Sequence, residues 1–435
     1  MRSLNDTKTA IKEALKAIHR GENVEELKKR LSGLLSKISP TDIPLIEQEL
    51  IKEGVSVREI LKLCDLHVAL FREHLAGREL AGVPQGHPLD LLLRENEKIT
   101  ALAEALGLYA KALERAEEVE KAKILAELRA LEGELRSLRS HYSKIQMLLF
   151  PYLEKMGLIA VPRVLWGKED EVLLKVRKLL GLLRGERVDP GELAALASEV
   201  SRGLQDLVFR ENKILFPSLW ALLDESAWSA ILEEMRRSRL GSLVEGLEEG
   251  WAPSVEPRLP HEWGLELSPS KIAGLAPEIH LILSSRGLSP DNYELRRDGD
   301  LELGTGYLSP RELAGILASL PLELTFADAE GRVRFYSESK LAKAFPRART
   351  VLGRRLEFCH PPRLERFVGE IFEELRRGKR DVVEFWTRRE GRTYRVLVVA
   401  VRGERGEFLG ALEIAEDLTN VIERASEIES EVLVV

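Results

Sequence analysis

Two segments of the chain contain the same Leu-Phe-Pro motif, and both have the apolar periodicity of a helix. The first, HYSKIQMLLFPYLEK, begins at His141, and the second, FRENKILFPSLW, begins at Phe209. Aligning them on Leu-Phe-Pro pairs Ile145 with Glu211, and His141 with Leu207. A helix with His and Glu four residues apart points both side chains the same way, as in bundles that hold a metal pair in their core. Here each copy keeps only half of the pair.

The length of 435 residues is too great for one hydrophobic core, so we expect several domains. A net charge of -7 offers no broad basic surface, which predicts no binding to nucleic acid. The N-terminus lacks a signal-peptide core, and no apolar run approaches the roughly 20 residues of a membrane helix, so we expect a cytoplasmic protein without membrane contact.

Two further features of composition bear on the cellular setting. The two cysteines, Cys64 and Cys359, lie in different segments, which indicates a reducing compartment rather than a disulfide framework. Abundant Leu, Glu and Arg, with few Gln and Cys, favour a thermophilic source.

The first two thirds of the chain read as helices. Residues 1–78 alternate helical patterns with Gly breaks, which predicts a small all-α domain, and RELAGVPQGHP then has the composition of a linker. Residues 87–240 contain four long amphipathic patterns and a shorter fifth from Ser226, which predicts a four-helix bundle. Residues 241–305 read as a connector.

From Ser309 the periodicity switches to alternation. After one helix, the sequence predicts two hairpins, each turning at a Glu-Gly pair, an amphipathic helix between them, and a fifth strand in GEFLGALEIAEDLT. We therefore expect an α+β domain with a five-stranded antiparallel sheet at 306–420, and a C-terminal helix at 421–435. The fold class is multidomain.

Several long motifs occur in the order of a known three-part family. They are LCDLHVALF in the first part; GHPLDLLLRENE, HYSKIQMLLFPYLEKMG, VLWGKEDEV and ENKILFP in the second; and LPLELTFADAEGRVRFYS, FCHPP and LGALEIAEDLT in the third. With these motifs the chain resembles proteins that join the domain of unknown function number 438, a hemerythrin-like HHE bundle and a PAS domain. The resemblance implies a non-haem iron or oxygen-responsive module linked to a small-molecule sensor.

The metal site that the resemblance implies is incomplete in this sequence. Hemerythrin-like bundles hold a pair of irons mainly with histidines, whereas this bundle has two histidines. Our hypothesis is that His87, His141, Asp170 and Glu211, one from each helix, converge on a metal, with Asp90 as a further ligand. Ferritin-like bundles bind iron or manganese with many carboxylates and few histidines.

A second interpretation needs no metal. Residues 169–171, Glu-Asp-Glu, would be favourable charges at a helix start, and His141 would be a core histidine. In this interpretation Ile145 and Leu207 close an apolar core. For the metal hypothesis, by contrast, Glu95, Glu169 and Glu171 are further available oxygen ligands.

Two further groups of residues have both a ligand-binding and a structural interpretation. Cys359 and His360 precede the amphipathic helix of the PAS part. They are interpreted either as haem ligands or as part of a loop that caps the helix. Trp386 and Tyr394 line either a ligand pocket or a plain core. Cys64, His67 and His74, at spacings of three and seven, share one face of a helix, either as ligands or as packed core.

The sequence contains no nucleophile elbow, phosphate-binding loop, dinucleotide fingerprint or Cys-x-x-Cys motif, so we expect no enzymatic activity. We predict a sensor that couples the bundle to the PAS domain and acts through a protein partner or as a homodimer, with 309–320 and 418–435 as dimer elements. The alternatives are an iron-binding or oxygen-reactive enzyme, and a metal-free scaffold with haem or another small ligand in the PAS domain.

Overall fold

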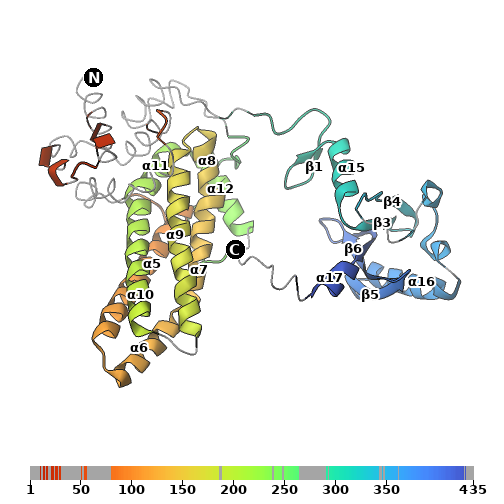
Figure 1. Ribbon diagram of the computed structural model, residues 1–435. Coiled ribbons are helices and arrows are strands. Elements are labelled where there is room, and N and C mark those ends of the chain that lie inside the picture. The colour runs from red at the N-terminus through yellow and green to blue at the C-terminus, as the bar shows by residue number, and fades with distance from the viewer. Residues whose placement is uncertain are drawn as a thin grey trace. The chain divides into compact units, whose positions relative to one another are not determined.

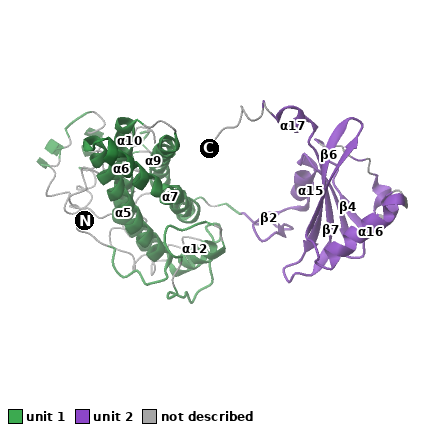
Figure 2. Cartoon of the chain, turned by 90° about the horizontal axis from the view of Figure 1, so that it is seen from below, with its two compact units in different colours: residues 1–294 green, residues 295–435 purple. Residues whose placement is uncertain are grey.

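The computed structural model divides the chain into two compact units, residues 1–294 and 295–435 (Figure 2). The residues that it describes are 80–185, 189–237, 240–246, 249–263, 291, 293–341, 345, 348–360, 362–425 and 427, with scattered positions before residue 56. Most of the predicted N-terminal domain, including Cys64, His67 and His74, lies outside the described residues.

The first unit contains the predicted helical bundle, which is confirmed. Its long helices lie side by side (Figure 1): α5 (Pro88–Arg115), α7 (Glu132–Lys144), α9 (Ala160–Arg184) and α10 (Pro190–Arg210). The shorter α6 (Glu118–Ala130) connects α5 to α7, and α12 (Glu225–Arg237) follows the bundle. Within the described residues, no helix combines the length and apolarity that crossing a membrane requires.

Local signals explain where these helices begin. Helix α10 begins after Asp189, whose side chain accepts hydrogen bonds from two backbone N–H groups of the first turn, and Pro190 occupies the first position. Helix α9 begins at Ala160, earlier than the sequence suggested, because Ala160 and Val161 are buried and Pro162 is tolerated in a first turn. The acidic residues 169–171 therefore lie in the middle of α9, and the prediction that they open a helix was wrong.

Small residues let the helices approach closely. A Cβ atom on Gly203 of α10 would lie 2.7 Å from Cγ2 of Val172 on α9, and one on Gly107 of α5 would lie 2.9 Å from Oγ of Ser201 on α10. The Ser201 hydroxyl donates to the carbonyl of Ala103 at 2.6 Å. The bundle core is thus closed on both sides of α10.

Both copies of the Leu-Phe-Pro motif contain a π-helical turn. One turn, Ile145–Leu149, leads into α8 (Phe150–Lys155), and the other, Glu211–Leu215, leads into α11 (Phe216–Leu222). The N–H of each motif Phe donates to the carbonyl five residues earlier. The following proline has no N–H and its ring crowds the carbonyl four residues before it, so a wider turn accommodates it.

Residues 240–246 and 249–263, which follow α12 in this unit, form neither helix nor strand. Trp251 N–H donates to the Gln85 carbonyl at 2.8 Å, and the Tyr152 hydroxyl donates to the Arg258 carbonyl at 2.8 Å. Residues 249–263 are therefore packed on the first unit, although the sequence indicated only a connector.

The second unit is built on the predicted five-stranded antiparallel sheet, which is confirmed. The strand order is β4-β3-β7-β6-β5, with β3 (Glu323–Asp328), β4 (Val333–Tyr336), β5 (Val382–Arg389), β6 (Arg392–Arg402) and β7 (Phe408–Asp417). Helix α16 (Pro362–Arg376) contacts β6 and β7. Helices α15 (Pro310–Ser319) and α17 (Thr419–Glu423) flank the sheet in sequence, and β1 (Leu301–Glu302) pairs with β2 (Tyr307–Leu308) ahead of α15.

Candidate functional site in the helical bundle

The two copies of the repeated motif meet in the bundle core. His141 lies on α7 and Glu211 opens the second π turn, and Nε2 of His141 is 3.0 Å from Oε2 of Glu211. Both side chains are fully buried, as are Ile145 and Leu207, which stand where each copy lacks its His or Glu. One copy supplies the His and the other the Glu, so together they form the pair that neither has alone.

The other two helices each add one buried carboxylate. Oε2 of Glu95 on α5 is 2.8 Å from Nδ1 of His141, and Oε2 of Glu169 on α9 accepts from the side-chain amide of Gln146 at 2.7 Å. Both carboxyl groups are fully buried. Four helical elements thus contribute one group each to a cluster of Glu95, His141, Glu169 and Glu211, called the buried cluster below.

The charges of the buried cluster are balanced within the protein. Burial lowers the pKa of His141, but the charges and hydrogen bonds of Glu211 and Glu95 outweigh it and raise that pKa to about 9. Burial raises the pKa of Glu95, but His141 and Lys144 outweigh it and lower that pKa to about 2. Lys144 Nζ donates to Oε1 of Glu95 at 2.8 Å. The cations His141 and Lys144 therefore face the carboxylates of Glu95 and Glu211.

Glu169 differs from the other two carboxyl groups. Burial raises its pKa, the hydrogen bond from Gln146 opposes the rise, and the charge of Glu211 adds to it, so that the pKa reaches about 8. Glu169 therefore holds its proton at neutral pH. Burial, with the charges of Glu211 and Glu169, raises the pKa of the nearby Tyr142 hydroxyl well above its ordinary value.

Three oxygens in this part of the core lack a hydrogen-bond partner among the described residues. They are the Tyr142 hydroxyl, Oε1 of Glu169 and Oε1 of Glu211, all buried. An unpaired buried polar atom costs free energy, so native proteins usually supply it with a partner. Carboxylate and phenol oxygens beside one imidazole suit a hard or borderline cation such as manganese or iron. The donor atoms are therefore of the kind that such a cation takes, although the described residues do not gather them into a metal centre.

The same residues do not fit a pair of irons held mainly by histidines. The buried cluster contains one histidine, and both of its ring nitrogens face carboxylates. Nζ of Lys144 already contacts Oε1 of Glu95 at 2.8 Å. Across the part of the chain that the structure describes, no three His, Cys, Asp or Glu side chains are gathered as a ready metal centre.

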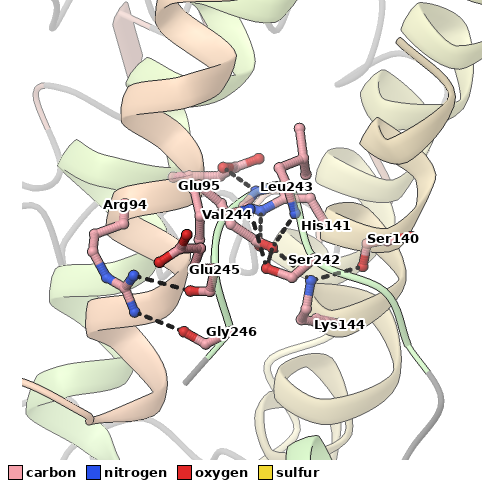
Figure 3. A network of polar contacts seen from close by, with 11 residues as sticks. Arg94, Glu95, Ser140, His141, Lys144, Ser242, Leu243, Val244, Glu245 and Gly246 are labelled. Carbon is pink, nitrogen blue, oxygen red and sulfur yellow. Dashed lines mark hydrogen bonds and ion pairs between the residues drawn. The ribbon is translucent and has the colours of Figure 1, made fainter. Parts of the chain in front are cut away.

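A segment from outside the bundle reaches the buried cluster. Residues 240–246, called the strap below, cross the helices beside α5 (Figure 3). Oε1 of Glu95 accepts from the Ser242 hydroxyl at 2.7 Å and from the Leu243 N–H at 3.1 Å. The neighbouring Arg94 donates to the carbonyls of Glu245 at 3.3 Å and Gly246 at 3.1 Å.

Of the five predicted metal ligands, the structure brings together His141 and Glu211 and places the other three elsewhere. Nδ1 of His87 accepts from the N–H of Leu89 at 3.1 Å and caps α5. Asp90 accepts from the Gly86 N–H and pairs with Arg94 in the first turn of α5. Asp170 is exposed, because it follows the inward-facing Glu169 by one residue, about 100° around the helix.

Lys144 and Ser242 complete the site and were not singled out from the sequence, whereas Glu95 and Glu169 were noted as available oxygen ligands but not placed among the predicted five. The signal for the two Glu residues was their spacing. Glu95 stands three residues after Leu92 and four before Ile99, both fully buried, so it occupies the apolar stripe of α5. A carboxylate at a stripe position is a stronger sign of a buried site than one in a first turn. Ser242 has no comparable signal.

The four predicted ligand residues of the PAS part are not gathered in one place. Cys359 is exposed, and Nδ1 of His360 is 2.8 Å from the Leu356 carbonyl, as in a loop that leads into α16. Trp386 on β5 is 53% exposed, whereas Tyr394 on β6 is buried against Phe345 and Phe385. Tyr394 pairs with the residue after Trp386, so the two side chains point to opposite faces of the sheet.

Family models match three successive parts of the chain. Residues 11–77 match a family of unknown function, DUF438; residues 87–219 match the hemerythrin HHE cation binding domain; and residues 313–419 match a PAS domain. The buried cluster lies inside the second match. No curated protein matches the chain.

Two solved structures are similar to parts of the chain. A C-terminal domain from Streptococcus mutans is 37% identical, with 29% of this chain and 98% of that chain covered and a TM-score of 0.28. A sensory box sensor histidine kinase from Vibrio cholerae is 11% identical, with 25% and 91% covered and a TM-score of 0.20. The chain is thus similar, in successive parts and in this order, to the DUF438 family, the hemerythrin HHE cation binding domain and a PAS domain.

Proposed function

We propose that this protein is a sensory regulator in which the bundle binds a cation and the PAS domain binds a small ligand. The matches to a hemerythrin HHE cation binding domain and to a PAS domain support the sensory role. The buried cluster supports the cation. The state of one module would then alter the packing of the chain, with a protein partner as the output.

The observation that carries the proposal is the set of three buried, unpartnered oxygens on Tyr142, Glu169 and Glu211. We propose that these oxygens, with Nε2 of His141 once that nitrogen has released its proton to solvent, hold one cation, iron being our first choice. When bound, an iron would supply a charge that changes on oxidation. Glu95 would orient the His141 ring through Nδ1, as carboxylates behind metal-ligating histidines do.

The test is a titration of chelator-treated protein with Mn²⁺, in which the melting temperature of the protein is measured at each Mn²⁺ concentration. A cation that binds the folded state alone raises stability, by about 2.7 kcal/mol at a hundredfold excess over its dissociation constant. We expect wild type to be stabilised and Glu211→Gln to lose most of the effect. The matched control is Asp170→Asn, which removes an exposed carboxylate beside the site. Equal stabilisation of both variants, or none in wild type, contradicts the proposal.

For the output, we propose a homodimer formed through the helices that flank the PAS sheet. Apolar side chains on both are solvent-exposed: Ile316 of α15 at 46%, Val421 of α17 at 50% and Ile422 at 53%. A second copy would cover them. Light scattering after size-exclusion chromatography tests this proposal. We expect wild type to have the mass of a dimer, and Ile316→Asp and Ile422→Asp to have the mass of a monomer. A monomeric wild type would contradict it.

A further inference from the structure

The strap is held on the bundle by two consecutive residues of α5 that act at different depths. It forms neither helix nor strand. Arg94, which is half-buried, donates to the backbone carbonyls of the exposed residues Glu245 and Gly246 at the end of the strap. Glu95, fully buried, grips its middle through the Ser242 hydroxyl and the Leu243 N–H. The Ser242 oxygen in turn accepts from the Val244 N–H at 3.3 Å.

The Glu95 carboxylate is divided between the core and the strap. Oε2 faces Nδ1 of His141, while Oε1 accepts from Ser242, Leu243 and Lys144. Hydrogen bonds to an ionised carboxylate are short and strong. A displacement of the Glu95 carboxylate therefore weakens the hydrogen bonds from the donors around it. Figure 3 shows Glu95, His141 and the strap residues in one network of polar contacts.

We propose that Glu95 is a positioning residue through which the buried cluster sets how firmly the strap is held. An imidazole ring fixed at Nε2 fixes the carboxylate that faces Nδ1, and that carboxylate fixes Ser242 and Leu243. The strap precedes residues 249–263 in the chain, so its release would report the state of the bundle to the C-terminal part of the protein. The part of this inference that concerns a cation rests on the proposed function.

The first experiment needs no cation. Amide hydrogen exchange of the strap, measured by mass spectrometry on chelator-treated protein, is compared between wild type and Glu211→Gln. The variant keeps the shape of the side chain but removes the charge that holds Nε2 of His141. We expect exchange at Leu243 and Val244 to quicken about tenfold, the scale of one lost charged hydrogen bond. Asp170→Asn should leave it unchanged.

The second experiment adds Mn²⁺ and uses two substitutions of the same residue. We expect Mn²⁺ to slow strap exchange in wild type and in Ser242→Thr, which keeps the hydroxyl, but not in Ser242→Ala. Arg94→Met is the matched control, because it loosens the strap at its exposed end: exchange should be faster with and without Mn²⁺, and the response to Mn²⁺ should remain. A merely structural role for Ser242 would quicken exchange without removing that response.

The outcomes separate this inference from the proposed function. If metal analysis finds bound Mn²⁺ and wild-type strap exchange does not change, the coupling is wrong while the cation site stands. If no Mn²⁺ binds, the proposed function fails and the Glu211→Gln comparison alone decides the coupling. Unchanged exchange in Glu211→Gln, with faster exchange in Ser242→Ala proving the assay, overturns it.

Discussion

Tyr142 places a fully buried hydroxyl beside two carboxyl groups without a hydrogen-bond partner among the described residues. Removing such a group removes its desolvation cost. We therefore expect Tyr142→Phe to leave the chelator-treated protein as stable as wild type or more stable, by up to about 2 kcal/mol, as measured by urea unfolding. The same variant should bind Mn²⁺ more weakly. Lower stability with unchanged binding would mean that the hydroxyl has a structural partner and no ligand role.

His87 is predicted to make the protein sensitive to acid. It packs among the rings of Trp220, Trp228 and Trp251, with centroids 5.1, 4.7 and 4.5 Å away, and burial lowers its pKa to about 4 from 6.5. The unfolded chain therefore takes up a proton at this residue before the folded chain does. The contribution of neutral His87 to the free energy of unfolding is fully present above about pH 6.5. It decreases as the pH falls towards 4, by up to about 3 kcal/mol.

The comparison for this prediction is His87→Asn, which keeps a capping side chain but does not titrate. Urea unfolding at about pH 7 and about pH 4.5 should show a smaller loss of stability on acidification in the variant than in wild type. The same loss in both would assign the acid sensitivity to other groups. The stabilising contribution of Glu95, whose pKa is lowered, also decreases on acidification, but it decreases equally in the variant and in wild type.

At the scale of helices, the sequence predicted the elements better than the directions of their side chains. Apolar periodicity and capping residues located the bundle helices, and the repeated Leu-Phe-Pro motif identified His141 and Glu211. The choice between Asp170 and Glu169 depends on helix phase, which the assumption that residues 169–171 open a helix obscured. The π turns add a residue before each proline, and that shift cannot be read from a regular 3.6-residue period.

Two Gly→Ala substitutions distinguish the effect of close contact between helices from the effect of helix propensity on stability. Gly203 of α10 and Gly181 of α9 are both helical, and replacing a helical Gly by Ala favours the helix by up to about 1 kcal/mol. A Cβ on Gly181 meets no atom within 4 Å, whereas one on Gly203 would lie 2.7 Å from Val172. We expect Gly181→Ala to be stabilising and Gly203→Ala to be destabilising by about 1 kcal/mol in urea unfolding. Stabilisation by both would mean that α9 and α10 separate without cost.

At the scale of the whole molecule, the order of three domains was predictable from motifs, whereas the link between them was not. Residues 240–263 carry no periodicity, yet their contacts run from Glu95 at the buried cluster to Asp224, which accepts from Trp263 at 3.1 Å. Such contacts join residues far apart in sequence and depend on single side chains such as Ser242. The proposed coupling lies in this segment.

The most direct test of the buried cluster as a cation site is the metal content and visible absorption spectrum of the full-length protein purified without added metal. We expect about one iron or manganese ion per chain, lost in Glu211→Gln and retained in Asp170→Asn, without the absorption bands of an oxo-bridged iron pair. A stoichiometric iron pair, or metal-free protein that also fails to take up Mn²⁺, would contradict this assignment.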